Sequence, residues 1–156
     1  MEMELKILDN RITEDMLKPA TDGSAGIDLH ATGYASRQMF PSDIIVINPN
    51  KAVLIKTGIA VHIKDPRYAA MILPRSGLGH KKGLILGNSV GLIDSDYHGE
   101  LMISAWNRST TDILVGQLEK IAQLIFVPVV RAHFKIVPEF SESTDRCEGG
   151  FGSTDK

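Results

Sequence analysis

The stretch Asn88–Trp106 holds the residues best suited to chemistry, because it places two carboxylates and a tyrosine between two apolar runs. The polar segment between the runs, Asp94–Gly99, has the composition of a turn. The pattern predicts a β-hairpin whose tip presents Asp94, Asp96 and Tyr97. An Asp-Ser-Asp segment can also do no more than hydrogen-bond its own backbone and close a loop.

Two further segments carry groups that bind anions. Pro74–Gly79 follows an apolar run and offers backbone N–H groups, a hydroxyl and a guanidinium to one anion. Gly149–Thr154 repeats this composition near the C-terminus, with Arg146 upstream and Phe151 among the glycines. The simpler interpretations are a helix-capping serine beside a solvated arginine, and a flexible Gly/Ser tail. Both segments are candidate anion-binding sites.

Two isolated polar residues stand within otherwise apolar runs. Gln123 lies in Lys120–Ile125, where it could bind a ligand or satisfy a buried backbone group. Asp28 follows Ala25-Gly-Ile and is predicted to lie at a strand edge. Each signal is weak alone.

The composition excludes several classes of protein. A chain of 156 residues with 43% hydrophobic and 23% charged residues fits one globular domain with one core. A net charge of −2 gives no general attraction for nucleic acid or anionic membranes. The single Cys147 permits no intrachain disulfide and no zinc-site spacing, so a reducing cytoplasm is expected. A secretory signal and a membrane-spanning segment are not expected.

Short apolar runs separated by turn residues predict an all-β protein, a jelly roll or β-sandwich of short strands. One short helix is predicted around Ser76–Lys81, ended by Gly83. We expect the folded domain to span residues 1–140 and a mobile C-terminal arm to span 141–156. An edge strand is predicted within Met3–Leu8, and further strands at Ile44–Ile47, Val53–Lys56, Ile59–Ile63, Ala69–Leu73, Leu84–Leu86, Leu101–Trp106, Ile121–Val130 and Phe134–Val137.

The order of the segments is more specific than any one of them. AGIDL, RSG, GNSVGLIDSDYHGE, IAQLI and GGFGST follow one another over most of the chain. This series resembles the five ordered motifs of the trimeric dUTP pyrophosphatases (dUTPases). The intervening SGLGHKKGLILGN and LMISAWNR also resemble that family.

The resemblance implies hydrolysis of dUTP to dUMP and pyrophosphate with Mg²⁺, by a jelly-roll homotrimer whose active sites each draw on three subunits. Asp94 would be the catalytic residue that activates the water attacking the α-phosphorus, and Asp28 would hold Mg²⁺ through water. Phe151 would stack on uracil as the arm closes. The substrate-binding set implied by motif position is Arg75, Ser76, Gly77, Asn88, Leu92, Ile93, Asp94, Tyr97, Met102, Gln123, Arg146, Gly150, Phe151, Gly152, Ser153 and Thr154.

Elementary chemistry agrees with this assignment. Phosphoryl transfer needs a positioned water and neutralised phosphate charge more than covalent help. Mg²⁺ keeps several waters and takes phosphate oxygens, so a carboxylate cluster is not required.

The chain departs from the family motifs at three positions. Lys120 stands where Arg is usual, which keeps the charge and loses bidentate geometry. Cys147 stands where Gly is usual, and Asp155 where Gly often closes the tail. Asp155 would place a negative charge near the γ-phosphate and weaken closure of the arm.

Two other functions are compatible with this fold. The related dCTP deaminases share it, but the fifth motif is not expected in them. A binding protein could keep the pocket and use nucleotide occupancy to regulate a partner, although an intact Asp94 speaks against an inactive enzyme.

Overall fold

The computed structural model describes residues 2–35, 37–38 and 43–148, which form mainly short β-strands. Two short helical turns, η1 (Glu14–Leu17) and η2 (Leu78–Lys82), lie between strands. The strands are β1 (Glu4–Ile7), β2 (Ile27–His30), β3 (Gly33–Tyr34), β4 (Arg37–Gln38), β5 (Ile44–Ile47), β6 (Ala52–Lys56), β7 (Ile59–His62), β8 (Tyr68–Pro74), β9 (Leu84–Leu86), β10 (Gly91–Ile93), β11 (Met102–Asn107), β12 (Ile113–Gly116) and β13 (Lys120–Pro128).

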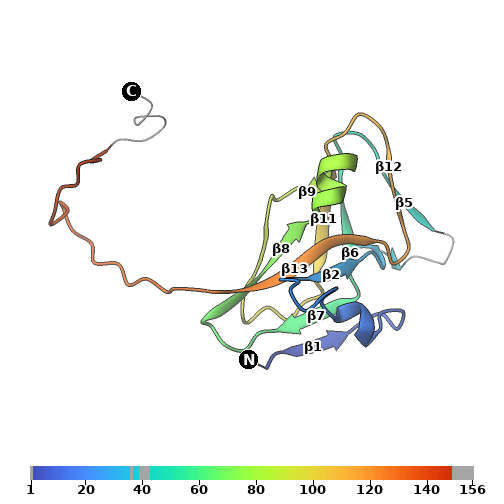
Figure 1. The fold of residues 1–156 in the computed structure, drawn as a ribbon, viewed down its shortest axis with the longest axis horizontal. Helices are drawn as coiled ribbons and strands as arrows, with labels where there is room; N and C mark the ends of the chain where they lie inside the picture. The colour runs from blue at the N-terminus through green and yellow to red at the C-terminus, as the bar shows by residue number, and fades with distance from the viewer. Residues whose placement is uncertain (1, 36, 39–42, 149–156) are drawn as a thin grey trace.

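Two larger sheets make up a β-sandwich (Figure 1). One has the strand order β10-β8-β13-β2, and the other β4-β3-β6-β11-β9. Alternate residues of β11 are buried, as expected for a strand with one face on a core. Ile72 and Leu124 of the first sheet and Ile55 and Ile103 of the second belong to one buried cluster. The predicted all-β class and single core are confirmed.

Most of the predicted strands are confirmed within a residue or two at each end. β5 and β9 have the predicted bounds, and β1 pairs with β7 as a two-stranded sheet. The predicted strand Phe134–Val137 is wrong, because that segment has no strand partner and its backbone is irregular. β12, which pairs with β5, was not predicted.

The predicted hairpin around Asp94 is also wrong. β10 pairs with β8, with Leu92 opposite Met71, whereas β11 pairs with β6 and β9. Residues 94–101 therefore cross from one sheet of the sandwich to the other. Apolar runs mark both strands, but their pattern does not specify which strand is the hydrogen-bonding partner.

The helical turn near Ser76 is confirmed in a modified form. η2 is a single π-helical turn that ends at Gly83, whose φ of 76° is left-handed. Its N-terminal cap is Gly77, and no side chain caps it. Ser76 is therefore not the capping residue that the simpler interpretation requires.

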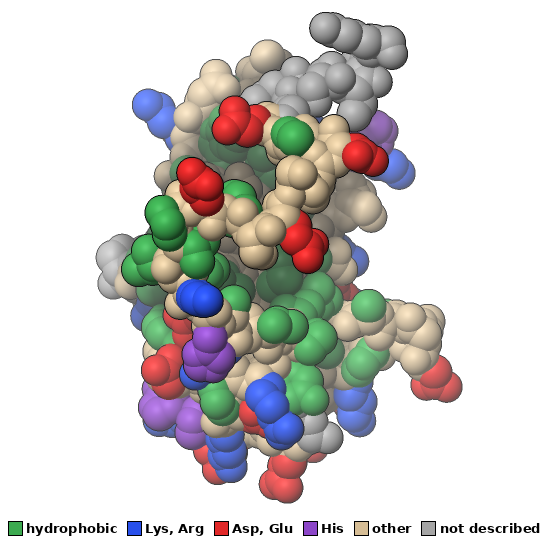
Figure 2. Space-filling model, turned by 90° about the vertical axis from the view of Figure 1, so that its left-hand side faces the viewer, with side chains coloured by type: hydrophobic (Ala, Val, Ile, Leu, Met, Phe, Trp, Pro, Cys, Tyr) green, Lys and Arg blue, Asp and Glu red, His purple; other side chains and the backbone are tan. Residues whose placement is uncertain are grey.

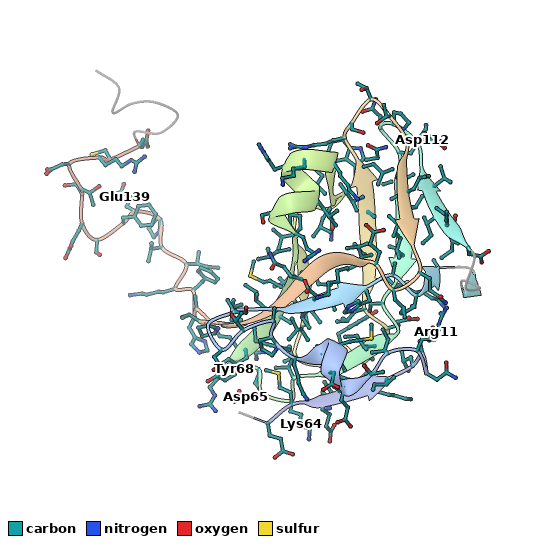
Figure 3. All side chains as sticks on the ribbon, turned by 45° about the vertical axis from the view of Figure 1, so that its right-hand side comes forward. Arg11, Lys64, Asp65, Tyr68, Asp112 and Glu139 are labelled. Carbon is teal, nitrogen blue, oxygen red and sulfur yellow. The ribbon has the colours of Figure 1, made fainter. Side chains whose placement is uncertain are left out.

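The chain leaves the sandwich after β13 (Figure 1). Val129 N–H still donates to Arg67 O at 2.7 Å, and the segment beyond it extends away from both sheets. Figure 3 places Glu139 on this segment, far from Tyr68 at the start of β8. In the part of the chain that the structure describes, no helix has the length and apolar character needed to span a membrane.

Candidate active site

The connection between β10 and β11 forms one wall of a pocket of about 300 Å³, which we call the Tyr97 pocket. It collects five of the predicted site residues, although Asn88 lies in the turn before β10 and does not line it. The lining residues are Leu54, Leu92, Ile93, Asp94, Tyr97, Glu100, Leu101 and Met102.

The Asp94 carboxylate is available to a ligand or a water molecule. The turn is closed by the backbone, because Tyr97 N–H donates to Asp94 O at 3.2 Å. Among the described residues, no side chain or backbone group hydrogen-bonds or ion-pairs with the Asp94 or Asp96 carboxylate. The interpretation that these side chains only close their own loop is therefore not supported.

A second pocket of about 510 Å³, the Arg75 pocket, lies at the end of β8. It collects the predicted anion-binding residues of the segment after β8 together with Gln123 of β13 and Asp28 of β2. Gln123 Nε2 donates to Pro74 O at 3.1 Å, so this amide also supports the loop. The residues with polar groups or open backbone include Ser24, Gly26, Asp28, Arg75, Ser76, Gly77 and Gln123.

Asp28 is the counter-ion of two cations beside this pocket. Arg75 Nε lies 3.0 Å from Asp28 Oδ1, and Lys120 Nζ lies 2.9 Å from Asp28 Oδ2. The Asp28 side chain is 18% exposed, whereas those of Arg75 and Lys120 are 38% and 48% exposed. Both cationic side chains are therefore accessible to an anion in the pocket, and their ion pairs with Asp28 keep them beside it.

His30 lies at the end of β2, behind this charge cluster, and is 4% exposed. Burial lowers the pKa of His30 below its usual 6.5; Lys120 and Arg75 lower it further, and Asp28 raises it. At acidic pH the folded protein therefore binds fewer protons at His30 than the unfolded chain does. The stability contributed by neutral, buried His30 is fully present above about pH 6.5, and it is lost as the pH falls below that value.

Thermal unfolding should show how the protonation of His30 affects stability. We expect the Tm of the parent to fall as the pH decreases from about 7 to about 5.5, and His30→Gln to show a weaker decrease over the same window. Differential scanning fluorimetry of both proteins at matched ionic strength measures it. Parallel Tm curves would mean that His30 does not contribute to the acid dependence.

The Tyr97 pocket and the Arg75 pocket have no lining residue in common. Leu92 and Ile93 of β10 line the first, and the residues at the end of β8 line the second. A single chain therefore presents the Asp94 carboxylate and the Arg75 and Lys120 cations at separate places.

Comparison with known proteins identifies the family. The family model described as dUTPase matches residues 13–155. This chain belongs to the dUTPase family. The deoxyuridine 5'-triphosphate nucleotidohydrolase of Paraburkholderia phymatum is 53% identical over 156 residues, which cover 100% of this chain and 99% of the relative. That of Burkholderia cenocepacia is 54% identical over 154 residues, covering 99% and 98%.

Solved structures agree with the dUTPase assignment. A mutant of the Staphylococcus bacteriophage 80alpha dUTPase, with dUpNHpp, matches with a TM-score of 0.77 and 26% identity, covering 98% of each chain. The dUTPase of phage phi11 of S. aureus shares the fold, with a TM-score of 0.75 and 23% identity over 91% of this chain and 100% of that one. The predicted family and fold are thereby confirmed.

The fifth dUTPase-like motif lies largely outside the described residues. This applies to Gly150, Phe151, Gly152, Ser153 and Thr154, and to Asp155. Arg146 is described and exposed. Cys147, where the motif usually has Gly, has a φ of 43°, the left-handed region that Gly adopts most easily.

The predicted site set omits Lys120 and several of the residues that line these pockets. Glu100 lines the Tyr97 pocket, and Lys120, noted before only as a departure from the motif, pairs with Asp28. A signal for Glu100 was present, because it closes the motif that contains Asp94. Leu54 comes from β6, a strand that carries no motif residue.

Proposed function

We propose that this chain hydrolyses dUTP to dUMP and pyrophosphate, with Asp94 as the general base. The observation that carries the proposal is the unpartnered Asp94 carboxylate beside Tyr97 in a pocket with an apolar wall. Asp94 takes a proton from a water molecule that attacks the α-phosphorus, and the bond from that phosphorus to the pyrophosphate oxygen breaks. The activity limits uracil incorporation into DNA and supplies dUMP for thymidylate synthesis.

The Arg75 pocket binds the triphosphate in this proposal. Arg75 and Lys120 neutralise phosphate charge, while Ser76, Gly77 and Gln123 offer hydroxyl, backbone and amide hydrogen bonds. The Tyr97 pocket takes the nucleoside, with Leu92, Ile93 and Met102 as apolar walls. Asn88, in the turn before β10, is also proposed to contact uracil.

The donor set suits Mg²⁺ held mainly by the substrate. Asp28 can accept from a metal-bound water as well as from its cations, because each carboxylate oxygen has more than one lone pair. No group of three or more His, Cys, Asp or Glu in the described ranges could hold a metal by itself. When bound, Mg²⁺ would neutralise phosphate charge and orient the triphosphate. The phage phi11 dUTPase is described as coordinating a structural Mg(II) ion.

Pyrophosphate release from dUTP, dTTP, dCTP and UTP, each with Mg²⁺, tests the proposal. Release from dUTP alone supports it. Ammonia released from dCTP would indicate a deaminase, and nucleotide binding without pyrophosphate would indicate a regulatory protein. A cytoplasmic location stays an expectation from the single Cys147.

We propose that the active enzyme is a homotrimer. Two observations support this: the separate pockets, and the apolar side chains on the segment after β13. Val130, Phe134, Ile136 and Phe140 are each at least 90% exposed, and large apolar groups on an extended segment need another surface to cover them. Hydrophobic side chains also gather on the face that Figure 2 shows, and a neighbouring copy can cover them.

Light scattering tests the homotrimer directly, because it measures the mass of the protein in solution. We expect three times the mass of the 17.1 kDa chain at micromolar concentration. A fully active species with the mass of one chain would contradict the shared active site.

Tyr97 is proposed to exclude ribonucleotides. Its ring lines the pocket and its hydroxyl donates to Glu100 O at 3.2 Å, so the ring is held where it can lie against a deoxyribose. A ring in that position leaves a 2′-hydroxyl no space and no partner. Discrimination against dTTP is assigned to the backbone that would meet the 5-methyl group.

We expect Tyr97→Ala to lower the ratio of kcat/KM for dUTP to that for UTP by about tenfold or more, or roughly 1.4 kcal/mol of discrimination. Steady-state kinetics with both substrates measures the ratio. An equal loss for dUTP and UTP would show that the ring supports the loop without contacting the sugar.

A further inference from the structure

The connection 94–101 is attached along its length to residues 57–64, which comprise the β6–β7 turn, β7 and the two residues after it. Lys64 N–H donates to Ser95 O at 3.3 Å near its start, and Thr57 Oγ1 donates to Leu101 O at 2.6 Å at its end. Between these points the rings of His62 and His98 meet edge to face with their centroids 4.2 Å apart. The loop that carries Asp94 and Tyr97 therefore takes its position from this neighbouring segment.

Glu100 makes the charged attachment of the loop. Its side chain is 20% exposed, its Oε1 accepts from Gly58 N–H at 2.9 Å, and its Oε2 lies 3.7 Å from Lys56 Nζ. The contact with Gly58 N–H depends on an acceptor oxygen at the end of a side chain of this length. The reach and direction of the Glu100 side chain therefore restrain the end of the loop.

Gly58 is a fixed point for this attachment. Its φ is 71°, and an added Cβ would lie 2.7 Å from Asp9 Cβ, so neither the backbone conformation nor the neighbouring chain leaves room for another residue. Its carbonyl also accepts from Leu8 N–H at 2.7 Å. Glu100 thus binds a backbone group that the Leu8–Asp9 segment holds in place.

The same residue also fixes the tyrosine. Tyr97 OH donates to the Glu100 carbonyl, while the Glu100 side chain reaches Gly58. We infer that Glu100 is a positioning residue: its carboxylate anchors the loop to Gly58, and its carbonyl thereby holds the Tyr97 ring in the orientation that selects the sugar. The inference rests on the proposed function, because it requires Tyr97 to contact the deoxyribose.

Three substitutions separate the geometry of Glu100 from its charge. Glu100→Ala removes the acceptor, and Glu100→Asp keeps the charge but shortens the side chain by one methylene and loses reach to Gly58 N–H. Glu100→Gln keeps an acceptor oxygen at the original length without charge. We expect the dUTP/UTP ratio of kcat/KM to fall about fivefold or more in Glu100→Ala and Glu100→Asp. The ratio in Glu100→Gln should stay within about twofold of the parent value.

Asp112→Ala is the matched control, since it removes a carboxylate that pairs with Asn48 at 3.1 Å. Asp112 lies at the end of the molecule opposite Lys64, away from this loop (Figure 3). Its dUTP/UTP ratio should equal that of the parent. Tm measurements on every variant separate a loss of selectivity from a loss of folded protein.

The inference is overturned if Glu100→Ala and Glu100→Asp lower kcat/KM for dUTP and UTP by the same factor, or if Glu100→Asp keeps the ratio and Glu100→Gln loses it. If Glu100→Ala does not fold, the comparison of Glu100→Asp with Glu100→Gln decides alone. A parent protein with no preference for dUTP would refute the proposed function instead. If the parent prefers dUTP and the dUTP/UTP ratio of kcat/KM is unchanged in Glu100→Ala and Glu100→Asp, only the role of Glu100 is refuted.

Discussion

Asp94→Asn is expected to lower the turnover of dUTP by at least about 10²-fold while most nucleotide affinity remains. Asparagine keeps the size and shape of the side chain but cannot take the proton from water at neutral pH. The free carboxylate of Asp94 in the Tyr97 pocket is the reason for expecting a large effect. Pyrophosphate release under single-turnover conditions, together with a binding isotherm for a non-hydrolysable dUTP analogue, separates chemistry from binding.

Asp96→Asn is the matched control for this experiment. Asp96 is exposed, lies two positions further along the same connection, and does not line the Tyr97 pocket. Its loss should change turnover by less than about threefold, since it removes a similar charge without removing the base. Parent-like turnover by Asp94→Asn would make Asp94 a structural turn residue and would remove the central assignment.

Truncation after Thr144 is expected to reduce turnover severely, by about 10²-fold or more, with little change in Tm. The removed residues include Arg146 and the Gly149–Thr154 segment, which are proposed to close over the nucleotide and exclude water. The stability should survive because the buried cluster consists of residues up to Leu124. Steady-state kinetics and thermal unfolding of the truncated protein measure both effects.

Removal of only Asp155 and Lys156 provides the comparison for this truncation. The shorter deletion keeps the whole glycine-rich motif and removes the carboxylate that we expect to weaken closure. Its turnover should equal or exceed that of the parent. Unchanged turnover after the longer truncation would show that the arm is not a catalytic lid.

Local patterns were sufficient for the strands but not for their partners. Ile44–Ile47 is a short apolar run bounded by turn residues, and that pattern predicted this strand from sequence. The structure buries only alternate residues of it. The prediction of a hairpin around Asp94 rested on the tendency of consecutive strands to pair with each other. It was wrong because β10 pairs with β8 and β11 pairs with β6. The apolar residues Phe134 and Ile136 suggested a strand, yet they stand on an exposed segment, because apolar type does not specify which surface covers a residue.

The candidate site was predicted residue by residue rather than as an arrangement. Tyr97, Leu92 and Met102 do share a pocket with Asp94, as their common motif region suggested. Asn88 does not line that pocket, although it stands in the same motif. The role of Glu100 could not be predicted, because its partner Gly58 is 42 positions away and donates through its backbone.

By itself, the sequence determined the family, the all-β class and the identities of the groups available for chemistry. These properties depend on residue type, order and short-range periodicity, which are written along the chain. Only the tertiary structure decided that residues 94–101 join two sheets, that Asp28 holds both Arg75 and Lys120, and that the carboxylate and cationic pockets lie apart in one chain. Each of these depends on contacts between distant segments, which are selected by the packing of the whole core rather than by local preference.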